Sequence, residues 1–172
     1  MNCKQCIHHG VCPYLKNEDA NRCKKFKSNY KVEVETMNVK LEKWAYMPER
    51  AYPTDAGADL RTPHDVIVMP HGSAVVDTGV HIELPPNTVG MLKSKSGLNV
   101  KHGITSEGVI DVGYTGSIVV KLYNHSDKAY GFKAGDKISQ LVIMPILTPS
   151  FVQVDEFEET ERGNNGFGSS GK

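Results

Sequence analysis

The last residues of the chain, 162–172, combine one arginine, one phenylalanine, two serines and several glycines. Phe167 could cover a flat ring, and Arg162 could make a forked contact with phosphate oxygens. Glycine N–H groups and the hydroxyls of Ser169 and Ser170 would supply further hydrogen-bond donors. A segment with a single apolar side chain cannot build a core, so it predicts either a ligand-covering tail or a flexible Gly/Ser-rich terminus.

Two clusters in the middle of the chain also carry residue types suited to phosphate or sugar chemistry. Residues 94–98 combine two hydroxyls, an ammonium group and a glycine, the composition of a phosphate cradle, although short loops of this kind are common. Residues 108–116 hold Asp111 and Tyr114 between glycines, which predicts a β-hairpin with both side chains at its mouth. There the Asp could activate water and the Tyr could pack on a sugar; the alternative is a turn-forming Asp and a cross-strand Tyr.

Two further clusters are weaker by themselves. Residues 56–61 place Asp59 between small residues just after a loop, a pattern typical of an ordinary turn into a strand. Residues 135–141 place Gln140 inside an apolar strand, where its amide must find hydrogen-bond partners. A satisfied core amide is the alternative to a ligand contact at this position.

The four cysteines of the chain share one short N-terminal region: Cys3, Cys6, Cys12 and Cys23. They predict a small cysteine-rich module over residues 1–29, because a core of that size needs a staple. In a reducing cytosol clustered thiols favour a structural Zn²⁺ site, with His8 and His9 as substitute ligands. Free thiols or disulfides and an iron–sulfur cluster remain open. A nucleic-acid or protein partner of the module is also open, since Lys24, Lys25 and Lys27 come directly after the last cysteine; a solvated face is the alternative for this short run of charges.

Composition bounds the rest of the chain. With 172 residues, a formal net charge of zero, 16 glycines and 9 prolines, the chain suits one β-rich domain with a small appendage. Zero net charge gives no overall basic field for nucleic acid or an acidic membrane. The sequence has no long apolar run and no signal peptide, so we expect a soluble, cytoplasmic protein without membrane contact.

These clusters must be positioned by strands. Segments that alternate apolar and polar residues, or are rich in Val and Ile, predict strands at 31–35, 37–42, 65–69, 73–84, 88–92, 117–124, 137–146 and 150–154. Turn signals separate them at 70–72, 85–87, 124–127 and 134–136, and no amphipathic helix of ten residues is expected after Tyr30. Many short strands indicate an all-β barrel or jelly roll over residues 30–155, followed by a tail at 156–172.

Numbered along the chain, the five clusters are 56–61, 94–98, 108–116, 135–141 and 162–171. In this order they resemble the five motifs of the homotrimeric dUTPases. The resemblance runs from about Lys31 to the end of the chain, and its third and fifth motifs are highly specific. It implies an all-β, dUTPase-like jelly-roll or β-clip barrel, a homotrimer, and three active sites each assembled from all three chains. The tail of one subunit would close over a site built by its neighbours. The substrate would be dUTP, hydrolysed to dUMP and pyrophosphate.

The resemblance also implies a role for the matched positions of the third motif. Asp111 would be the general base that aligns and deprotonates the water attacking the α-phosphorus, and it would hydrogen-bond the 3′-hydroxyl. Tyr114 would stack under the deoxyribose and exclude a 2′-hydroxyl. Backbone groups of Gly108, Val109 and Ile110 would read the uracil edge as an added strand would, leaving no room for a 5-methyl group.

The other motifs would hold the triphosphate and the metal. Ser96 and Gly97 would contact the α/β bridging region, Lys95 and Gln140 the phosphate oxygens. The tail would supply a γ-phosphate clamp, a uracil-stacking ring and assisting donors: Arg162, Phe167, Gly168, Ser169 and Ser170. Mg²⁺ would be chelated chiefly by the triphosphate and water, and Asp59 would act through a metal-bound water.

Four features depart from the family pattern. Lys95 stands where Arg is usual, which keeps the charge and loses bidentate geometry. Gly113 stands where a second Asp is frequent, and Asn165 where Gly is usual. The cysteine module lies outside the usual family unit, an extension compatible with a phage or bacterial member.

Two other functions compete with dUTP hydrolysis. A dCTP deaminase shares the fold but needs a Glu in the strand after the third motif, where this chain has Lys121. A regulatory or interaction protein on a dUTPase scaffold, with the cysteine module as its contact surface, is the second alternative. Asp111, Tyr114, Arg162 and Phe167 argue against lost catalysis but leave an additional regulatory role open.

Overall fold

The computed structural model describes residues 36–165. The cysteine module expected at 1–29, the strand expected at 31–35, and Phe167 to Ser170 of the tail lie outside the described residues. Those expectations remain predictions.

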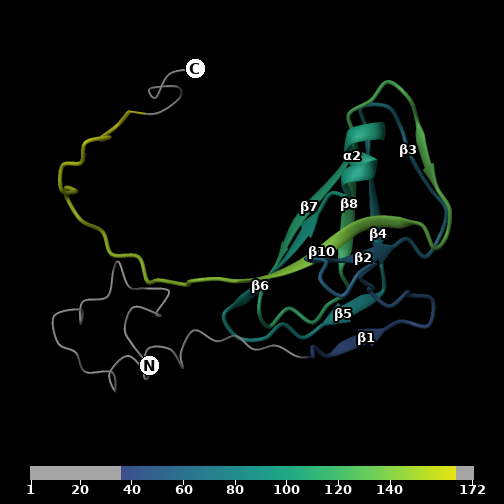
Figure 1. Ribbon diagram of the computed structural model, residues 1–172, viewed down its shortest axis with the longest axis horizontal. Coiled ribbons are helices and arrows are strands. Elements are labelled where there is room, and N and C mark those ends of the chain that lie inside the picture. The colour runs from purple at the N-terminus through teal and green to yellow at the C-terminus, as the bar shows by residue number, and fades with distance from the viewer. Residues whose placement is uncertain (1–35, 166–172) are drawn as a thin grey trace.

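The described chain is built mainly from short strands, as the alternating pattern predicts (Figure 1). The strands are β1 (Val39–Leu41), β2 (Gly57–Arg61), β3 (Val66–Val68), β4 (Ser73–Asp77), β5 (Val80–Ile82), β6 (Thr88–Lys93), β7 (Ile104–Ile110), β8 (Val119–Asn124), β9 (Tyr130–Phe132) and β10 (Lys137–Pro145). Helix α2 (Ser96–His102) lies between β6 and β7. No helix among residues 36–165 is long and apolar enough to cross a membrane.

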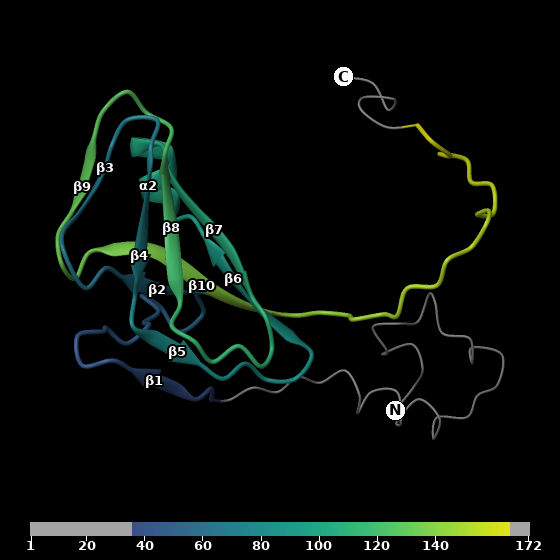
Figure 2. The same cartoon turned by 180° about the vertical axis from the view of Figure 1, so that it is seen from behind.

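A six-stranded sheet in the order β2-β10-β6-β7-β8-β4 forms the body of the fold. Its neighbouring strands pair antiparallel, and two antiparallel ribbons, β1-β5 and β3-β9, flank it (Figures 1 and 2). Burial alternates strictly along β8, so one face of that strand packs inward and the other faces outward. The inward side chains form one aliphatic core that includes Leu60, Val76, Ile104, Leu122 and Leu141.

The strand expected at 73–84 is two strands, β4 and β5. Gly79, which has a φ of 66°, ends the first strand because this left-handed backbone cannot continue a pleat. A side chain there would also meet the Trp44 ring, since an added Cβ would lie 2.6 Å from its Cζ3. The break turns the chain so that β5 pairs with β1 while β4 pairs with β8.

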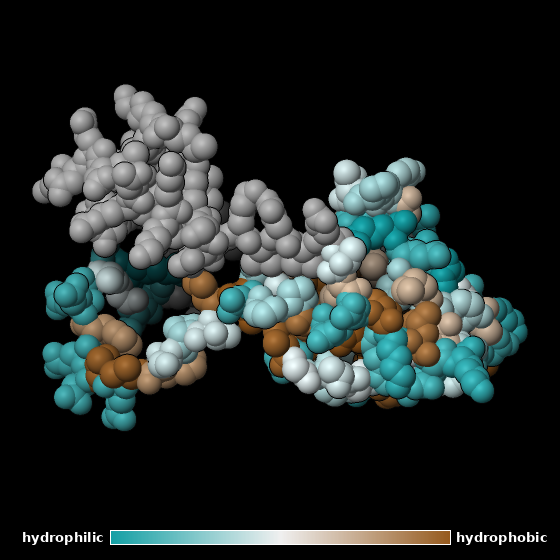
Figure 3. Space-filling view, turned by 90° about the horizontal axis from the view of Figure 1, so that it is seen from below, coloured by the Kyte–Doolittle hydropathy of each residue, from teal (hydrophilic) through white to brown (hydrophobic). Residues whose placement is uncertain are grey.

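The expected strand at 150–154 is wrong, and two strands were missing from the sequence-based set. Residues 146–165 carry no strand and extend away from the β domain (Figure 1). Several apolar side chains of this segment are almost fully exposed, Phe151 at 99% and Phe157 at 91% among them, and Figure 3 shows such atoms along it. A strand needs a pairing partner, and the described chain offers this segment none. The strands missing from the expectation are β7 and β9.

The hairpin expected at 108–116 is present in an open form. β7 continues to Ile110 and β8 begins at Val119, but the two strands pair only from Ile104 to Ser106. Beyond Ser106 they separate, so the loop between them sits at a splayed mouth. On its other side β7 stays paired with β6 from Glu107 to Ile110.

Candidate active site

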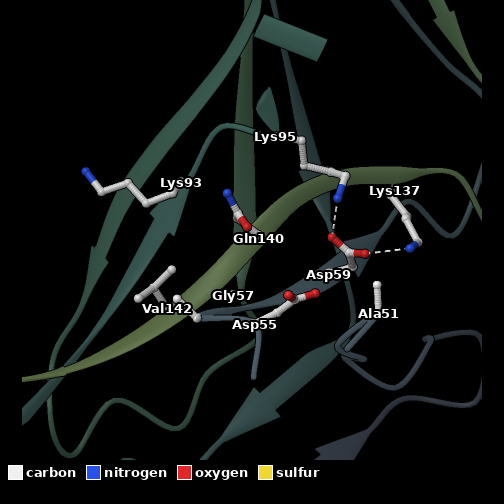
Figure 4. Close-up of a pocket in the computed structure, with 10 residues that line it drawn as sticks. Ala51, Asp55, Gly57, Asp59, Lys93, Lys95, Lys137, Gln140 and Val142 are labelled. Atoms are coloured by element: carbon white, nitrogen blue, oxygen red, sulfur yellow. Dashed lines mark hydrogen bonds and ion pairs between the residues drawn. The ribbon is translucent and has the colours of Figure 1, made fainter. Parts of the chain in front are cut away.

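A cavity of about 380 Å³ opens where β2, β10 and β6 lie side by side (Figure 4). Its wall is strongly charged, with three lysines against two aspartates. The lining residues are Ala51, Asp55, Ala56, Gly57, Asp59, Lys93, Lys95, Lys137, Gln140 and Val142. A polar cavity with surplus positive charge is suited to an anionic ligand.

Asp59 lies at the centre of this wall and is paired with two lysines. The Lys137 Nζ is 2.6 Å from Asp59 Oδ2, and the Lys95 Nζ donates to Oδ1. The Asp59 side chain is only 8% exposed, so its charge requires such partners. Burial alone would raise the pKa of Asp59, but the hydrogen bonds and charges of Lys137 and Lys95 hold this pKa below its ordinary value.

A β-bulge brings Lys137 and Gln140 to the same side of β10. Strand alternation would place two residues three apart on opposite faces. Here the register against β2 shifts between Lys137, which pairs with Arg61, and Ser139, which pairs with Leu60. The extra residue, Ile138, turns its side chain into the core. Lys137 and Gln140 therefore both line the cavity.

Gln140 is held across the backbone of Gly57. Its Nε2 donates to the Ser94 carbonyl at 3.0 Å, which satisfies the amide that the sequence required to find a partner. A Cβ built on Gly57 would lie 2.4 Å from the Gln140 Oε1. The first cluster thus needs glycine because the fourth cluster packs directly on it.

The second cluster is the junction of β6 and α2. Lys95 precedes the helix with extended backbone angles, and Ser96 is the first helical residue. Ser94 fixes the junction, because its hydroxyl donates to the Ser106 carbonyl at 3.0 Å and accepts the Ser106 N–H at 2.9 Å. A Cβ on Gly97 would meet nothing within 4 Å, so the space beside this glycine is open.

The third cluster forms the loop between β7 and β8. Asp111 is exposed, and its carbonyl accepts the Tyr114 N–H at 3.1 Å in a turn that contains Gly113 at a φ of 90°. Tyr114 is 49% exposed, its hydroxyl donates to the Ser117 carbonyl at 3.0 Å, and its ring packs against Gly116. Both side chains are therefore presented at the mouth of the open hairpin.

Residues of β4 and β5 hold the far side of this loop. The Ser117 hydroxyl donates to Asp77 Oδ1, which also accepts the Gly79 N–H at 2.9 Å. These two hydrogen bonds, with burial opposing them, hold the pKa of Asp77 below its ordinary value. His81 Nδ1 lies 2.8 Å from the Thr115 carbonyl oxygen.

The structure brings some of the expected site residues together within one chain and leaves others apart. Asp59, Lys95 and Gln140 line one cavity, whereas Ser96, Gly97, residues 108–111 and Tyr114 are not among its lining residues. Arg162 lies in the exposed extended segment, where its Nε donates to the Asn165 carbonyl at 3.1 Å. Sequence analysis missed Lys137, Lys93 and Asp55 as lining residues of the cavity. Lys137 belongs to the fourth cluster, but the alternation of a regular strand would place it on the opposite face from Gln140.

Asp59 does not fit a role as a metal ligand in this arrangement. Both of its carboxylate oxygens are paired with ammonium groups, and cations at these positions would repel Mg²⁺. Residues 36–165 contain no group of three or more His, Cys, Asp or Glu side chains that could hold a metal ion. The side chains of the cavity therefore suit phosphate oxygens better than a cation.

Comparison with known proteins identifies relatives over most of the chain. Residues 43–171 match the family model of the dUTPases. A deoxyuridine 5′-triphosphate nucleotidohydrolase of Clostridium tetani is 42% identical over 141 residues, which is 80% of this chain and 97% of that protein.

Solved structures of phage proteins share the fold. The Staphylococcus bacteriophage 80alpha dUTPase with dUpNHpp superposes with a TM-score of 0.75 at 37% identity, covering 81% of this chain and 100% of that one. A mutant dUTPase from phage phi11 of S. aureus, described as coordinating a structural Mg(II) ion, has a TM-score of 0.66 at 34% identity, covering 72% and 99%.

Proposed function

This chain belongs to the dUTPase family and is a dUTP nucleotidohydrolase, and we propose which residues bind the substrate and which catalyse its hydrolysis. The observation that carries the proposal is the meeting of the first, second and fourth clusters around one cationic cavity, next to a sheet whose open hairpin presents Asp111. The cavity holds the triphosphate, and the hairpin supplies the base and reads the nucleoside.

Asp111 is the general base. Its carboxylate takes a proton from a water molecule, whose oxygen attacks the α-phosphorus while the bond to the bridging oxygen breaks and pyrophosphate leaves. Its exposure at the loop supports this role, because a base must reach solvent and substrate together. The hydrogen bonds that hold Ser117 and Thr115 on β4 and β5 limit the motion of the loop.

The triphosphate is held by the cavity side. Lys95 and Gln140 contact phosphate oxygens, while Ser96 and the open backbone at Gly97 receive the α/β bridging region. Surplus positive charge on the wall offsets the negative charge that builds on the leaving group. A Mg²⁺ ion chelated chiefly by the triphosphate and water would neutralise phosphate charge, while Asp59 is already paired with Lys95 and Lys137.

The nucleoside is read by the third cluster. Tyr114 lies under the deoxyribose, and the backbone of Gly108, Val109 and Ile110 pairs with the uracil edge. Within residues 36–165, the edge of β7 that faces β8 is paired only from Ile104 to Ser106, so these later residues keep a strand edge available for a base. The resemblance assigns this edge to uracil.

The site is completed by other copies of the chain. We infer a homotrimer in which the tail of one subunit closes over a neighbour's site, with Arg162 on the γ-phosphate, Phe167 on uracil, and Gly168, Ser169 and Ser170 as further donors. The extended segment supports this, because its Leu147, Phe151 and Phe157 are left exposed by the other residues of the range 36–165, and a neighbouring subunit could cover them.

Pyrophosphate release tests the proposal. Purified full-length protein should release pyrophosphate from dUTP, and at least a hundredfold more slowly from dCTP, dTTP and UTP, roughly the discrimination expected of a polar site that rejects a mismatched group. Comparable rates on dTTP would contradict the uracil-reading edge, and ammonia release from dCTP would indicate deamination. Lys121, which stands where a deaminase needs Glu, lies on the outward face of β8.

A regulatory role is the second candidate. The 80alpha dUTPase, whose fold this chain shares, is described as controlling transfer of virulence genes. If the present protein has such a role, Asp111→Asn should abolish hydrolysis and leave binding to the partner intact. Loss of both together would tie the binding to turnover.

A further inference from the structure

The Asp59 side chain faces two lysines. Its expected contact with a metal-bound water does not explain this arrangement. Each oxygen of its carboxylate accepts from a different ammonium group, that of Lys95 or that of Lys137. Asp59 is almost fully buried, whereas the side chains of Lys95 and Lys137 are 26% and 37% exposed. The carboxylate thus fixes two cations that still reach the cavity (Figure 4).

Each lysine retains hydrogen-bonding capacity toward a ligand. An ammonium group has three N–H donors, and Asp59 occupies one on each lysine. The remaining donors lie at the cavity wall beside Gln140 and Gly57, where the wall carries three lysines against two aspartates. A phosphate group could therefore bind these lysines without displacing Asp59.

Lys95 and Lys137 together also compensate for the absence of the arginine that is usual at position 95. A guanidinium offers two parallel N–H donors to one phosphate, which a single ammonium cannot reproduce. Two ammonium groups seated on the two oxygens of one carboxylate restore a two-pronged cation. This arrangement depends on the bulge in β10, because regular alternation would turn Lys137 to the opposite face from Gln140.

We propose that Lys137 is a further phosphate-binding residue of this site, and that Asp59 is a positioning residue whose carboxylate holds Lys137 and Lys95 together as a phosphate fork. This inference rests on the proposed hydrolysis of dUTP at the same cavity. It assigns Asp59 no contact with the metal or with its water shell.

A matched control, Lys133, lies in the connection between β9 and β10, just before the strand that begins at Lys137. Lys133 pairs with Asp65 at 2.6 Å, the same distance as the Lys137–Asp59 pair, but both side chains are exposed, at 82% and 59%, and neither lines the cavity. Lys133→Met therefore removes an equivalent charge and ion pair nearby without touching the proposed phosphate site.

Calorimetric binding of the non-hydrolysable analogue dUpNHpp with Mg²⁺ gives the test. Lys137→Met should weaken binding roughly tenfold to a hundredfold, the range expected when a charged hydrogen bond is lost. Lys133→Met should bind as the wild type does. Binding of deoxyuridine, which has no phosphate, should be equal in all three proteins when followed by NMR. Equal dUpNHpp affinity of the two variants would overturn the assignment.

Three further measurements keep the result interpretable. Lys137→Arg should restore most of the affinity, and thermal unfolding of each variant checks that it is folded. Asp59→Asn should weaken dUpNHpp binding more in the wild type than in the Lys137→Met background, because it acts through the lysines. The Mg²⁺ concentration that gives half-maximal activity should be unchanged by Asp59→Asn; an increase would return Asp59 to the metal shell and refute the positioning role.

Failure of the proposed function would look different from failure of this inference. If the wild-type protein neither binds dUpNHpp nor releases pyrophosphate from dUTP, the proposed function is wrong. If it does both while Lys137→Met matches Lys133→Met, only the assignment of Lys137 is wrong.

Discussion

His81 on β5 fixes the loop that carries Asp111, because its Nδ1 lies 2.8 Å from the Thr115 carbonyl oxygen. A ring nitrogen facing a carbonyl must carry the proton and donate. The other ring nitrogen, Nε2, is buried and lies 3.4 Å from the Glu42 carboxylate. Nε2 has no hydrogen-bond partner among the described residues, so the imidazole joins β5 to the loop that carries Asp111 through Nδ1.

His81→Leu should loosen that loop and lower kcat about twofold to tenfold, the effect of one net hydrogen bond on the alignment of the base. KM for dUTP should change less, because the phosphates are held elsewhere. His71→Leu is the control, since His71 pairs with Asp127 in an exposed turn. Steady-state kinetics of both variants would show whether the decrease is specific to His81; equal kinetics would remove it from the site.

Gly57→Ala should disturb the cavity through Gln140. The added methyl would lie 2.4 Å from Oε1 and 3.0 Å from Cβ of Gln140, so that side chain must leave Ser94. We expect a loss of about 1–3 kcal/mol in the free energy of unfolding and a higher KM for dUTP. Gly131→Ala, in β9 with nothing within 4 Å of the new methyl, serves as comparison in urea unfolding. A Gly57 variant as stable as the Gly131 variant would contradict the packing argument.

Asp111→Asn should separate catalysis from binding. If Asp111 is the proposed general base, its replacement should lower kcat by about 10²–10⁴, while the affinity for dUpNHpp should stay close to that of the wild type. Single-turnover hydrolysis and calorimetry measure the two effects. A variant with nearly full kcat would exclude Asp111 as the base.

Mixing experiments should reveal shared active sites. A chain truncated after Glu161 lacks the tail, and Asp111→Asn lacks the base, so each should be inactive alone. If one subunit's tail covers a neighbour's site, refolding the two chains together should restore part of the activity, because some sites then combine an intact base with an intact tail. A mixture as inactive as its components would argue that each chain builds its own site.

Acid should destabilise the loop support through Asp77. The pKa of Asp77 lies below its ordinary value of 3.8 because Ser117 and Gly79 donate to its carboxylate. A depressed folded-state pKa contributes stability above the ordinary pKa and loses it as pH falls through the folded value. Urea unfolding from pH 6 to pH 2.5 should therefore show a steeper loss below about pH 4 for the wild type than for Asp77→Asn. Asp155→Asn, in the exposed segment, should behave as the wild type.

Sequence patterns predicted the class of fold and most of the strands. Alternation and Val/Ile content located β6, β8 and β10 closely, since all three strands carry buried apolar side chains. They missed β7 and β9. They also joined β4 and β5 into one strand at 73–84, because Gly79 turns the chain where hydrophobicity continues. The expectation at 150–154 failed because an apolar pattern cannot show whether a partner strand is present.

For the site, residue types and their order along the chain were enough to identify the family and to nominate Asp59, Lys95, Asp111 and Gln140. Chemistry such as a phosphate-binding ammonium or a water-activating carboxylate is a property of the side chain, so it can be read without coordinates. The dUTPase relatives confirm the family assignment over residues 43–171.

The partners of those side chains were decided by the tertiary structure alone. A one-residue bulge turned Lys137 toward Gln140, and Asp59 was buried in ion pairs with Lys95 and Lys137. The position of Lys137 depends on strand register, and the pairing of Asp59 depends on which charged groups are buried together. Neither quantity is encoded locally along the chain, because both arise only when distant segments pack against one another.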